Sequence, residues 1–360
     1  MILCIYGRSS APFTEPTARA LHAAVEDLGG TLHPITLERA VAEHAQDPAH
    51  WADVRRVYVL PFDVPSRLPA DAPAAPAALI RWLMPRAEVF NSFDVHEICW
   101  DKPKLTEHWL QRGVRAPASL MTTSIEDATA FVQHHEWTIL KATHTGGGHG
   151  DYVVTVAADG LVAEARGQRY ELELVPAGAP PRIRDRQLLY PAPFFFQRLV
   201  ADVGARGVLT PGQLLRAYIV DGQLLFWTES YREHYRSASD WIVATGSGAK
   251  YRFLFGVGEE PRKLAMRAAE AVSLRIGVVD IVRTASDGAY ALSAHTDGHH
   301  LAIDREYKRL PEFRDAFDID RFIAEALLTE PEPIKREVVE GQEPPPPYTR
   351  VWRAPRRERE

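Results

Sequence analysis

The 360-residue sequence predicts an α/β fold in which a small unit with a parallel sheet precedes a longer unit with paired strands. Strand-like and helix-like patterns alternate over residues 1–90, as they do where helices connect parallel strands. Farther along, strand-like segments meet at Asp221-Gly222 and Asp287-Gly288, which favour tight turns between neighbouring strands. A glycine-rich loop within 146–150 separates two more strands.

The small unit begins with a strand-like apolar segment and alternates from there. A helix over 17–28 is expected to stop at Gly29-Gly30, because glycine accepts the backbone angles that end a helix. The other predicted elements are strands at 2–6, 31–35, 56–60 and 88–90 and a helix at 77–84. The proline-rich segment 65–78 is predicted to be a surface loop.

The longer unit opens with helical spacing over 95–113, closed by a glycine. The pattern then predicts helices at 124–134 and 261–276 and strands at 138–141, 151–156, 214–230 (a pair), 278–282 and 289–296. The last helices are expected to end near Leu328. Residues 329–360 mix proline with charge, cannot bury a core and are expected to be extended or disordered.

Composition narrows the class of protein. Charged residues make up 25% and apolar residues 46%, and the net charge of −6 argues against a general nucleic-acid-binding surface. Cys4 and Cys99 are the only cysteines, so we expect no disulfide framework. The same observation favours a reducing cytoplasm as the location of the protein. The start resembles no signal peptide, and no apolar run reaches membrane-spanning length. We expect a cytoplasmic protein without nucleic-acid or membrane partners; a homo-oligomer stays open.

The stretch LKATHTGGGHGDYVV, residues 140–154, has two interpretations. Glycines between strands are either a loose hairpin or a cradle whose backbone N–H groups approach phosphate oxygens without interference from Cβ atoms. A hairpin needs one or two glycines, whereas this loop has Gly146, Gly147, Gly148 and Gly150, with Lys141 before them. The count favours the phosphate cradle.

Five spaced segments together resemble the ATP-grasp superfamily, in the branch of glutathione synthetases, ribosomal-protein glutamate ligases and lysine-biosynthesis ligases. The segments are NSFDVHEICWDKPKLTEHWLQRGVRAPAS (91–119), WTILKATHTGGGHGDYVV (137–154), FFFQRLV (194–200), LLRAYIVDGQLL (214–225) and GVVDIV (277–282). The resemblance implies an ATP-grasp domain over 95–328, with a small lid subdomain at about 118–200, after a pre-ATP-grasp domain over 1–94.

The same resemblance implies which residues bind ATP. Lys102 and Lys141 would face the phosphates from the two sides of a cleft, next to the glycine loop. Backbone groups of a hinge would face the adenine edge; its residues are Gln197, Arg198, Leu199 and Val200. Asp202 would either bind the ribose hydroxyls or be an acid of a surface loop.

Catalytic roles are implied for three arginines. Arg216 would face the phosphate being transferred, because a planar guanidinium matches charge spread over several oxygens. Its alternative is a cross-strand ion pair. Arg232 and Arg236 would lie near the acceptor substrate, or on a solvated face.

The resemblance breaks at the metal site. Active relatives bind magnesium through an Asp, a Glu and an Asn, and here Asp280 is followed by Ser293 and His295 at the Glu and Asn positions. Three explanations stay open. Asp297 supplies the missing carboxylate, the histidines around 295–300 bind a transition metal, or the site has lost its metal.

The function implied by the resemblance is an ATP-dependent carboxylate–amine ligase that works through an acyl phosphate, with ATP and Mg²⁺ as cofactors and an amino acid or peptide as substrate. The alternatives are an ATP-binding regulatory protein without turnover and an ATP-dependent kinase on the same fold.

Overall fold

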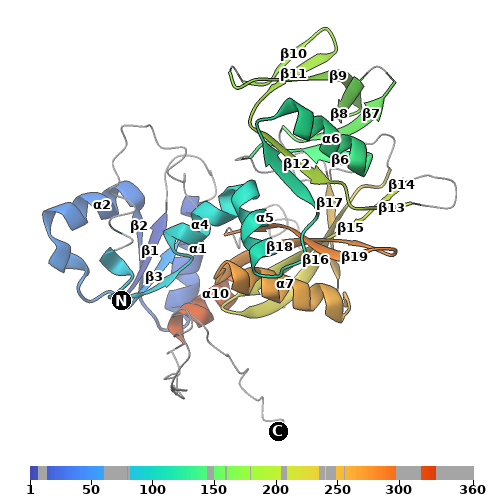
Figure 1. The fold of residues 1–360 in the computed structure, drawn as a ribbon. Helices are drawn as coiled ribbons and strands as arrows, with labels where there is room; N and C mark the ends of the chain where they lie inside the picture. The colour runs from blue at the N-terminus through green and yellow to red at the C-terminus, as the bar shows by residue number, and fades with distance from the viewer. Residues whose placement is uncertain are drawn as a thin grey trace, which may run out of the picture.

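The computed structural model describes residues 1–6, 14–60, 79, 82–143, 150–158, 160–178, 180–203, 209–234, 240, 249–254, 256–296 and 318–329. Within these ranges the strands form sheets of four, eight, five and two strands. Figure 1 shows the four-stranded sheet at the N-terminal side, the eight-stranded sheet at the top and the five-stranded sheet between helices below it. The predicted α/β class is confirmed.

The first unit holds a parallel sheet in the order β2-β1-β3-β4. Its elements are β1 (Ile2–Tyr6), α1 (Thr14–Asp27), β2 (Leu32–Thr36), α2 (Leu37–Gln46), a 3₁₀ turn (Pro48–Trp51), β3 (Arg56–Val59) and β4 (Glu88–Phe90). Gly29, with φ of +78°, follows α1 as predicted. Helix α2 was not predicted; Thr36 caps it by accepting a hydrogen bond from the Arg39 N–H.

The single helix predicted over 95–113 is two helices, α4 (Phe93–Trp100) and α5 (Lys102–Gln111). The break lies at Asp101, whose carboxylate accepts a hydrogen bond from the Lys104 N–H at 3.1 Å and starts a new helix. Pro103 suits the first turn of that helix, where its missing N–H costs nothing. This correction places Lys102 at a helix N-terminus.

The eight-stranded sheet and helix α6 form a unit that we call the lid. Its elements are β5 (Ser119–Thr122), α6 (Ile125–His135), β6 (Trp137–Leu140), β7 (Tyr152–Ala157), β8 (Gly160–Ala165), β9 (Gln168–Val175), β10 (Arg182–Arg184), β11 (Gln187–Pro191) and β12 (Phe194–Arg198). Ala128 and Val132 of α6 share an apolar core with Phe194 and Phe196 of β12.

The five-stranded sheet, which we call the core sheet, is antiparallel in the order β17-β16-β15-β18-β19. It contains β15 (Gln213–Val220), β16 (Gln223–Tyr231), β17 (Lys250–Leu254), β18 (Ile276–Thr284) and β19 (Gly288–His295), and a ribbon of β13 (Ala201–Val203) and β14 (Leu209–Pro211) precedes it. Helix α7 (Glu259–Ala271) ends earlier than the predicted 261–276, because Ile276 already belongs to β18.

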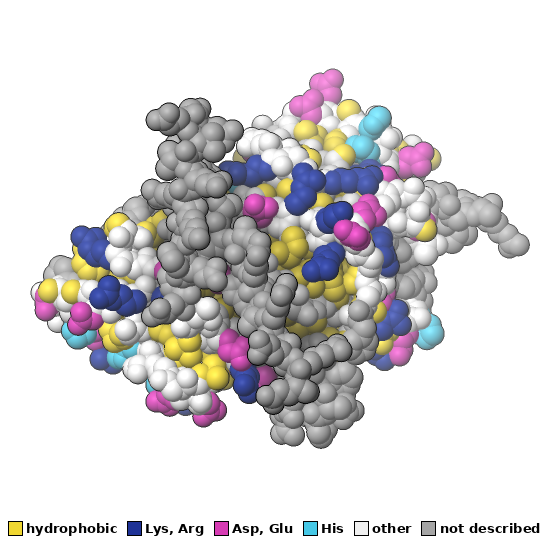
Figure 2. Space-filling model, turned by 90° about the horizontal axis from the view of Figure 1, so that it is seen from below, with side chains coloured by type: hydrophobic (Ala, Val, Ile, Leu, Met, Phe, Trp, Pro, Cys, Tyr) yellow, Lys and Arg dark blue, Asp and Glu magenta, His cyan; other side chains and the backbone are white. Residues whose placement is uncertain are grey.

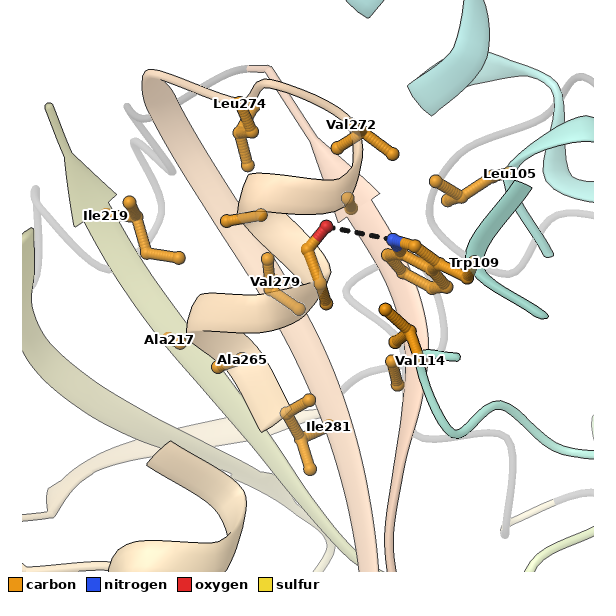
Figure 3. Packing of buried hydrophobic residues seen from close by; sticks show 14 of the residues in the cluster. Leu105, Trp109, Val114, Ala217, Ile219, Ala265, Val272, Leu274, Val279 and Ile281 are labelled. Carbon is orange, nitrogen blue, oxygen red and sulfur yellow. Dashed lines mark hydrogen bonds between the residues drawn. The ribbon is translucent and has the colours of Figure 1, made fainter. Parts of the chain in front are cut away.

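One face of the core sheet packs against α7 and α5. Figure 3 shows Trp109 of α5 beside α7, with its indole N–H donating to the carbonyl of Ala268 at 2.9 Å. Ala217, Val279 and Ile281 of the sheet lie in the same cluster. This packing fixes α5, and therefore Lys102 at its start, relative to the core sheet.

The other face of the core sheet meets the first unit. Helix α10 (Ile319–Leu328) lies beside α1, and both share an apolar cluster with Val220 and Val278 of the core sheet. Asn91, with φ of 55°, accepts hydrogen bonds from the N–H groups of Arg275 and Ile276 at 3.1 Å each. Asn91 therefore joins the first unit to β18.

Surface charge is uneven although the chain carries a net −6. On the face in Figure 2, Lys and Arg side chains are denser on the half away from the first unit, with apolar surface among them. Among the helices that the structure describes, none is both long and apolar enough to cross a bilayer.

Candidate functional site

Lys141 directly follows strand β6 and is buried, with 8% of its surface exposed. Its Nζ donates a hydrogen bond to Oε1 of Gln197 at 2.5 Å, and Gln197 belongs to the neighbouring strand β12. The Lys141 N–H donates to the carbonyl of Phe195 at 2.9 Å, and the Tyr190 hydroxyl donates to the Lys141 carbonyl at 3.4 Å. These contacts fix the direction of the Lys141 side chain at the C-terminal end of β6.

Lys102 approaches the same place from helix α5. Its Nζ donates to the carbonyl of Ala142 at 2.9 Å and to Oδ1 of Asp151 at 3.4 Å. Its own N–H bonds to the carbonyl of Thr143 at 3.2 Å, so α5 is tied to the chain that enters the glycine loop. The structure thus brings together the two lysines that the sequence predicted. It adds Asp151, which sequence reasoning did not single out although it follows the last glycine.

The surroundings of Lys141 shift the pKa of its ammonium group. Burial is the largest influence and lowers its pKa to about 8; the carboxylate of Asp151 opposes that shift, Lys102 reinforces it and Asp280 opposes it. Asp280 belongs to the core sheet, so Lys141 of the lid lies within electrostatic range of that sheet. A buried cation near such a small number of acids suits an incoming anion.

For the nucleotide that the sequence resemblance implies, we expect the affinity to fall as the pH rises through about 8, the lowered pKa of Lys141 in the free protein. A bound phosphate raises the pKa of the lysine, so binding takes up a proton, and affinity drops by up to about tenfold per pH unit between the free and bound pKa values. Calorimetry with ATP at pH 8.5, in two buffers of different ionisation enthalpy, measures the uptake. Lys141→Met should abolish it; equal heats in both buffers for the unmodified chain would contradict the assignment.

Arg216 and Asp280 face each other across strands β15 and β18. Arg216 donates to both carboxylate oxygens, Nε to Oδ1 at 2.6 Å and Nη2 to Oδ2 at 2.9 Å, and the side chains are only 9% and 7% exposed. Burial alone would raise the pKa of Asp280, but the Arg216 guanidinium outweighs it and holds the pKa far below its usual range. Arg216 forms the cross-strand ion pair that the sequence left as its alternative.

One donor of Arg216 stays available. Its buried Nη1 has no hydrogen-bond partner among the described residues. Buried polar groups are nearly always paired in folded proteins, so this guanidinium nitrogen is a candidate donor to a ligand oxygen. Arg216 can therefore hold Asp280 with one edge and an anionic oxygen with the other.

The residues at the predicted metal positions do not fit a magnesium centre. Both oxygens of Asp280 accept bonds from Arg216; the Ser293 hydroxyl also donates to Oδ2 at 2.8 Å, and Nε2 of His295 lies 3.4 Å from it. Magnesium favours several hard oxygen ligands, whereas this group offers one carboxylate that is already engaged, one hydroxyl and one imidazole. No cluster of three metal-ligating side chains occurs in the part of the chain that the structure describes. Asp297 lies outside the described residues.

Two backbone N–H groups of the predicted adenine hinge are engaged within the protein. The Arg198 N–H donates to the carbonyl of Ala118 at 2.8 Å, and the Leu199 N–H to that of Trp137 at 3.0 Å, so neither N–H faces a base. Gln197 uses its side chain on Lys141 instead. The carbonyls of Gln197, Arg198 and Leu199, and the backbone of Val200, which is buried beyond the end of β12, stay as the predicted contacts for the base edge.

The other predicted residues lie as follows. Asp202 lies in strand β13, not in a loop, and accepts hydrogen bonds from the N–H groups of Ala285 and Ser286 at 2.8 Å each, so it holds the β18–β19 turn. Arg232 pairs with Asp240 at 3.4 Å. Gly150 has φ of +77° next to Ala142. Gly146, Gly147, Gly148 and Arg236 lie outside the described residues, as does the tail from residue 330 onward.

Comparison with known proteins identifies the fold. No family model matches the sequence, and no curated protein matches it. Among solved structures, the ATP-grasp ligase PsnB complexed with a minimal precursor is 16% identical, with a TM-score of 0.56 over 91% of this chain and 97% of that one. The chain has the ATP-grasp fold.

Two further solved structures share the fold. The macrocyclase MdnC from Microcystis aeruginosa MRC, bound with precursor peptide MdnA, is 12% identical, with a TM-score of 0.53 over 91% of this chain and 99% of that one. D-cycloserine synthetase DcsG is 15% identical, with a TM-score of 0.54 over 91% and 98%. At these identities the likeness concerns the fold, and one fold supports many activities.

Proposed function

We propose that this chain is an ATP-dependent ligase that joins a carboxylate to an amine. The observation that carries the proposal is the convergence of Lys102, at the start of helix α5, and Lys141, directly after strand β6, near Asp151 and within electrostatic range of the core sheet. ATP brings a concentrated negative charge, and lysine is well suited to phosphate as a point charge. The ATP-grasp ligase PsnB, which has the same fold, has been determined in complex with a minimal precursor, and with that precursor, magnesium and ADP.

Each residue has a distinct role in this proposal. Lys102 and Lys141 hold the phosphates, Val200 borders the base, and Nη1 of Arg216 donates to the oxygens of the transferred phosphoryl group. A carboxylate oxygen attacks the γ-phosphorus, which gives an acyl phosphate and releases ADP. An amine then attacks the acyl carbon, loses a proton and expels phosphate, which leaves an amide. Exclusion of water by the lid protects the acyl phosphate from hydrolysis.

The substrate class follows from the same comparison. PsnB and MdnC were crystallised with precursor peptides, and we propose a peptide or amino acid carboxylate as acceptor of the phosphoryl group. Glutamate and short peptides that contain Asp or Glu are the probes of choice. In the test, ADP and phosphate are measured with MgCl₂, ATP and each probe, with hydroxylamine present to trap the acyl phosphate as a hydroxamate.

We expect ADP release that requires the carboxylate probe, together with hydroxamate formation, and loss of both in Lys141→Met. ADP release that ignores the carboxylate would identify a plain ATPase, and a phosphorylated hydroxyl product would identify a kinase. Either result would overturn the proposal.

The metal positions favour a second candidate, an ATP-binding protein without turnover. Its support is the engagement of Asp280 by Arg216, with a serine and a histidine where the family resemblance implies metal ligands. We expect Ser293→Glu combined with His295→Asn to raise the affinity for Mn²⁺ or Mg²⁺ at least tenfold, because a second carboxylate and an amide add hard oxygen donors beside Asp280. Metal titration followed by calorimetry measures this gain without any substrate. Unchanged metal affinity would show that these two positions do not border a cation site.

A further inference from the structure

The lid is one continuous stretch of chain, so it joins the rest of the molecule through two connections. One runs from α5 to β5 over residues 112–118, and the other runs from β12 to β15 over residues 199–212, of which 199–203 and 209–212 are described. Any movement of the lid relative to the core sheet is absorbed by these two connections, together with the contacts around Lys102.

Both connections are bound to the same carboxylate. Arg115, in the first connection, donates through Nη2 to Oδ1 of Asp287 at 2.9 Å. Arg198, where the second connection begins, donates through Nη2 to Oδ2 of Asp287 at 2.8 Å. Asp287 lies in the turn between β18 and β19, so one acid of the core sheet links both ends of the lid.

Tyr290 completes this link. The guanidinium carbon of Arg115 lies 4.1 Å and that of Arg198 5.1 Å from the centre of its ring. Its hydroxyl donates to Oδ2 of Asp287 at 2.7 Å and accepts from Nη2 of Arg115 at 2.8 Å. The bond from Tyr290, and then that from Arg198, hold the pKa of Asp287 below its usual value, so the acid stays ionised at neutral pH.

The ring of Tyr290 also packs against the predicted adenine hinge. Tyr290, Val200 and Val282 form a small apolar cluster, so the ring that the two arginines border also packs with Val200. Gly212, at the end of the second connection, approaches so closely that a Cβ atom there would lie 2.6 Å from Val282 and 3.0 Å from the Val200 carbonyl. Asp202 binds the adjoining turn residues Ala285 and Ser286. The second connection is therefore fastened to the β18–β19 turn at several points.

We propose that Asp287 and Tyr290 are positioning residues, which fasten both connections of the lid to one turn of the core sheet and thereby hold Val200 in place for the nucleotide. They act through Arg115 and Arg198 and need not touch the ligand. The proposal rests on the proposed function only for its nucleotide readout, because the fastening of the lid is a property of the free protein.

The test compares Asp287→Asn, Arg115→Gln, Arg198→Gln and the double variant Arg115→Gln/Arg198→Gln with the unmodified chain. The control is Glu43→Gln, which removes the carboxylate that pairs with the exposed Arg39 in the first unit. Hydrogen exchange of the nucleotide-free proteins is followed at β5 and β12, and ATP affinity is measured by calorimetry.

In the free protein we expect Asp287→Asn to speed exchange at β5 and β12 together, and Glu43→Gln to leave both unchanged. ATP binding should weaken about tenfold in Asp287→Asn, as expected when charge-assisted bonds to two arginines are lost. The double variant should bind ATP no more weakly than the weaker-binding of the two single variants, because the loss of either arginine already breaks the shared link.

If the losses of ATP affinity in the two single arginine variants multiplied in the double variant, the shared link would be overturned. Faster exchange of Asp287→Asn at only one of the two strands would overturn it as well. Coupled exchange with unchanged ATP affinity would overturn the positioning role. If the unmodified chain binds no ATP, the proposed function fails while the exchange data still decide whether the two connections are linked.

Discussion

Lys141→Met is expected to weaken ATP binding at least tenfold, which is about 1.4 kcal/mol. The lysine is buried, its Nζ is directed by Gln197, and charges interact more strongly where water is excluded. Methionine keeps the apolar stem and removes the ammonium group, so the fold should be preserved. Lys102→Met should have a similar effect from the other side of the site. Calorimetry with ATP measures both.

Helix α5 offers a matched control. Lys104 lies two residues after Lys102, its side chain is 57% exposed and it pairs with Glu97 and Asp101 at the surface. Lys104→Met should leave the ATP affinity unchanged. If Lys104→Met and Lys102→Met weakened binding equally, the effect would be one of general charge, and the assignment of Lys102 to the phosphates would be wrong.

Asp280→Asn is expected to lower the free energy of unfolding by about 3–5 kcal/mol, because it leaves Arg216 buried without its ionic partner. The double variant Arg216→Met/Asp280→Leu should recover most of that loss, since apolar side chains of similar size often replace a buried ion pair at little cost. Glu43→Gln, at the surface, should cost about 0–1 kcal/mol. Urea denaturation measures all three. A loss below about 1 kcal/mol for Asp280→Asn would show that the pair does not form.

The same ion pair sets a direction for acid sensitivity. The folded-state pKa of Asp280 lies below its ordinary value of 3.8, so its contribution to stability is complete above that value and is lost as the pH falls below it. The stability difference between the unmodified chain and Asp280→Asn should therefore shrink as the pH is lowered from about 5 toward 2. A constant difference over that range would contradict the depressed pKa.

Sequence patterns were sufficient for the fold but not for its details. The parallel first sheet and the strand pairs of the core sheet follow from alternation and from Asp-Gly turns. Strands β8 to β11, over 160–191, were missed because charged residues interrupt them and exposed positions are frequent there. The break between α4 and α5 was missed because apolar spacing continues through Asp101, and the capping role of that residue outweighs the spacing.

The site shows the same division. Lys102 and Lys141 were predicted from segment order and lie together. The pairing of Arg216 with Asp280, which are 64 positions apart, depends on the register between their two strands. A single amino-acid sequence carries no signal for such a register. For the same reason the sequence did not show that the N–H groups of Arg198 and Leu199 donate hydrogen bonds to the carbonyls of Ala118 and Trp137.

A crystal structure of the chain with a non-hydrolysable ATP analogue tests the central claim most directly. The account predicts the triphosphate within hydrogen-bonding distance of Nζ of Lys141 and of Lys102, an oxygen of the γ-phosphate at Nη1 of Arg216, and the base against Val200. A nucleotide bound elsewhere, or phosphates that contact neither lysine, would contradict it.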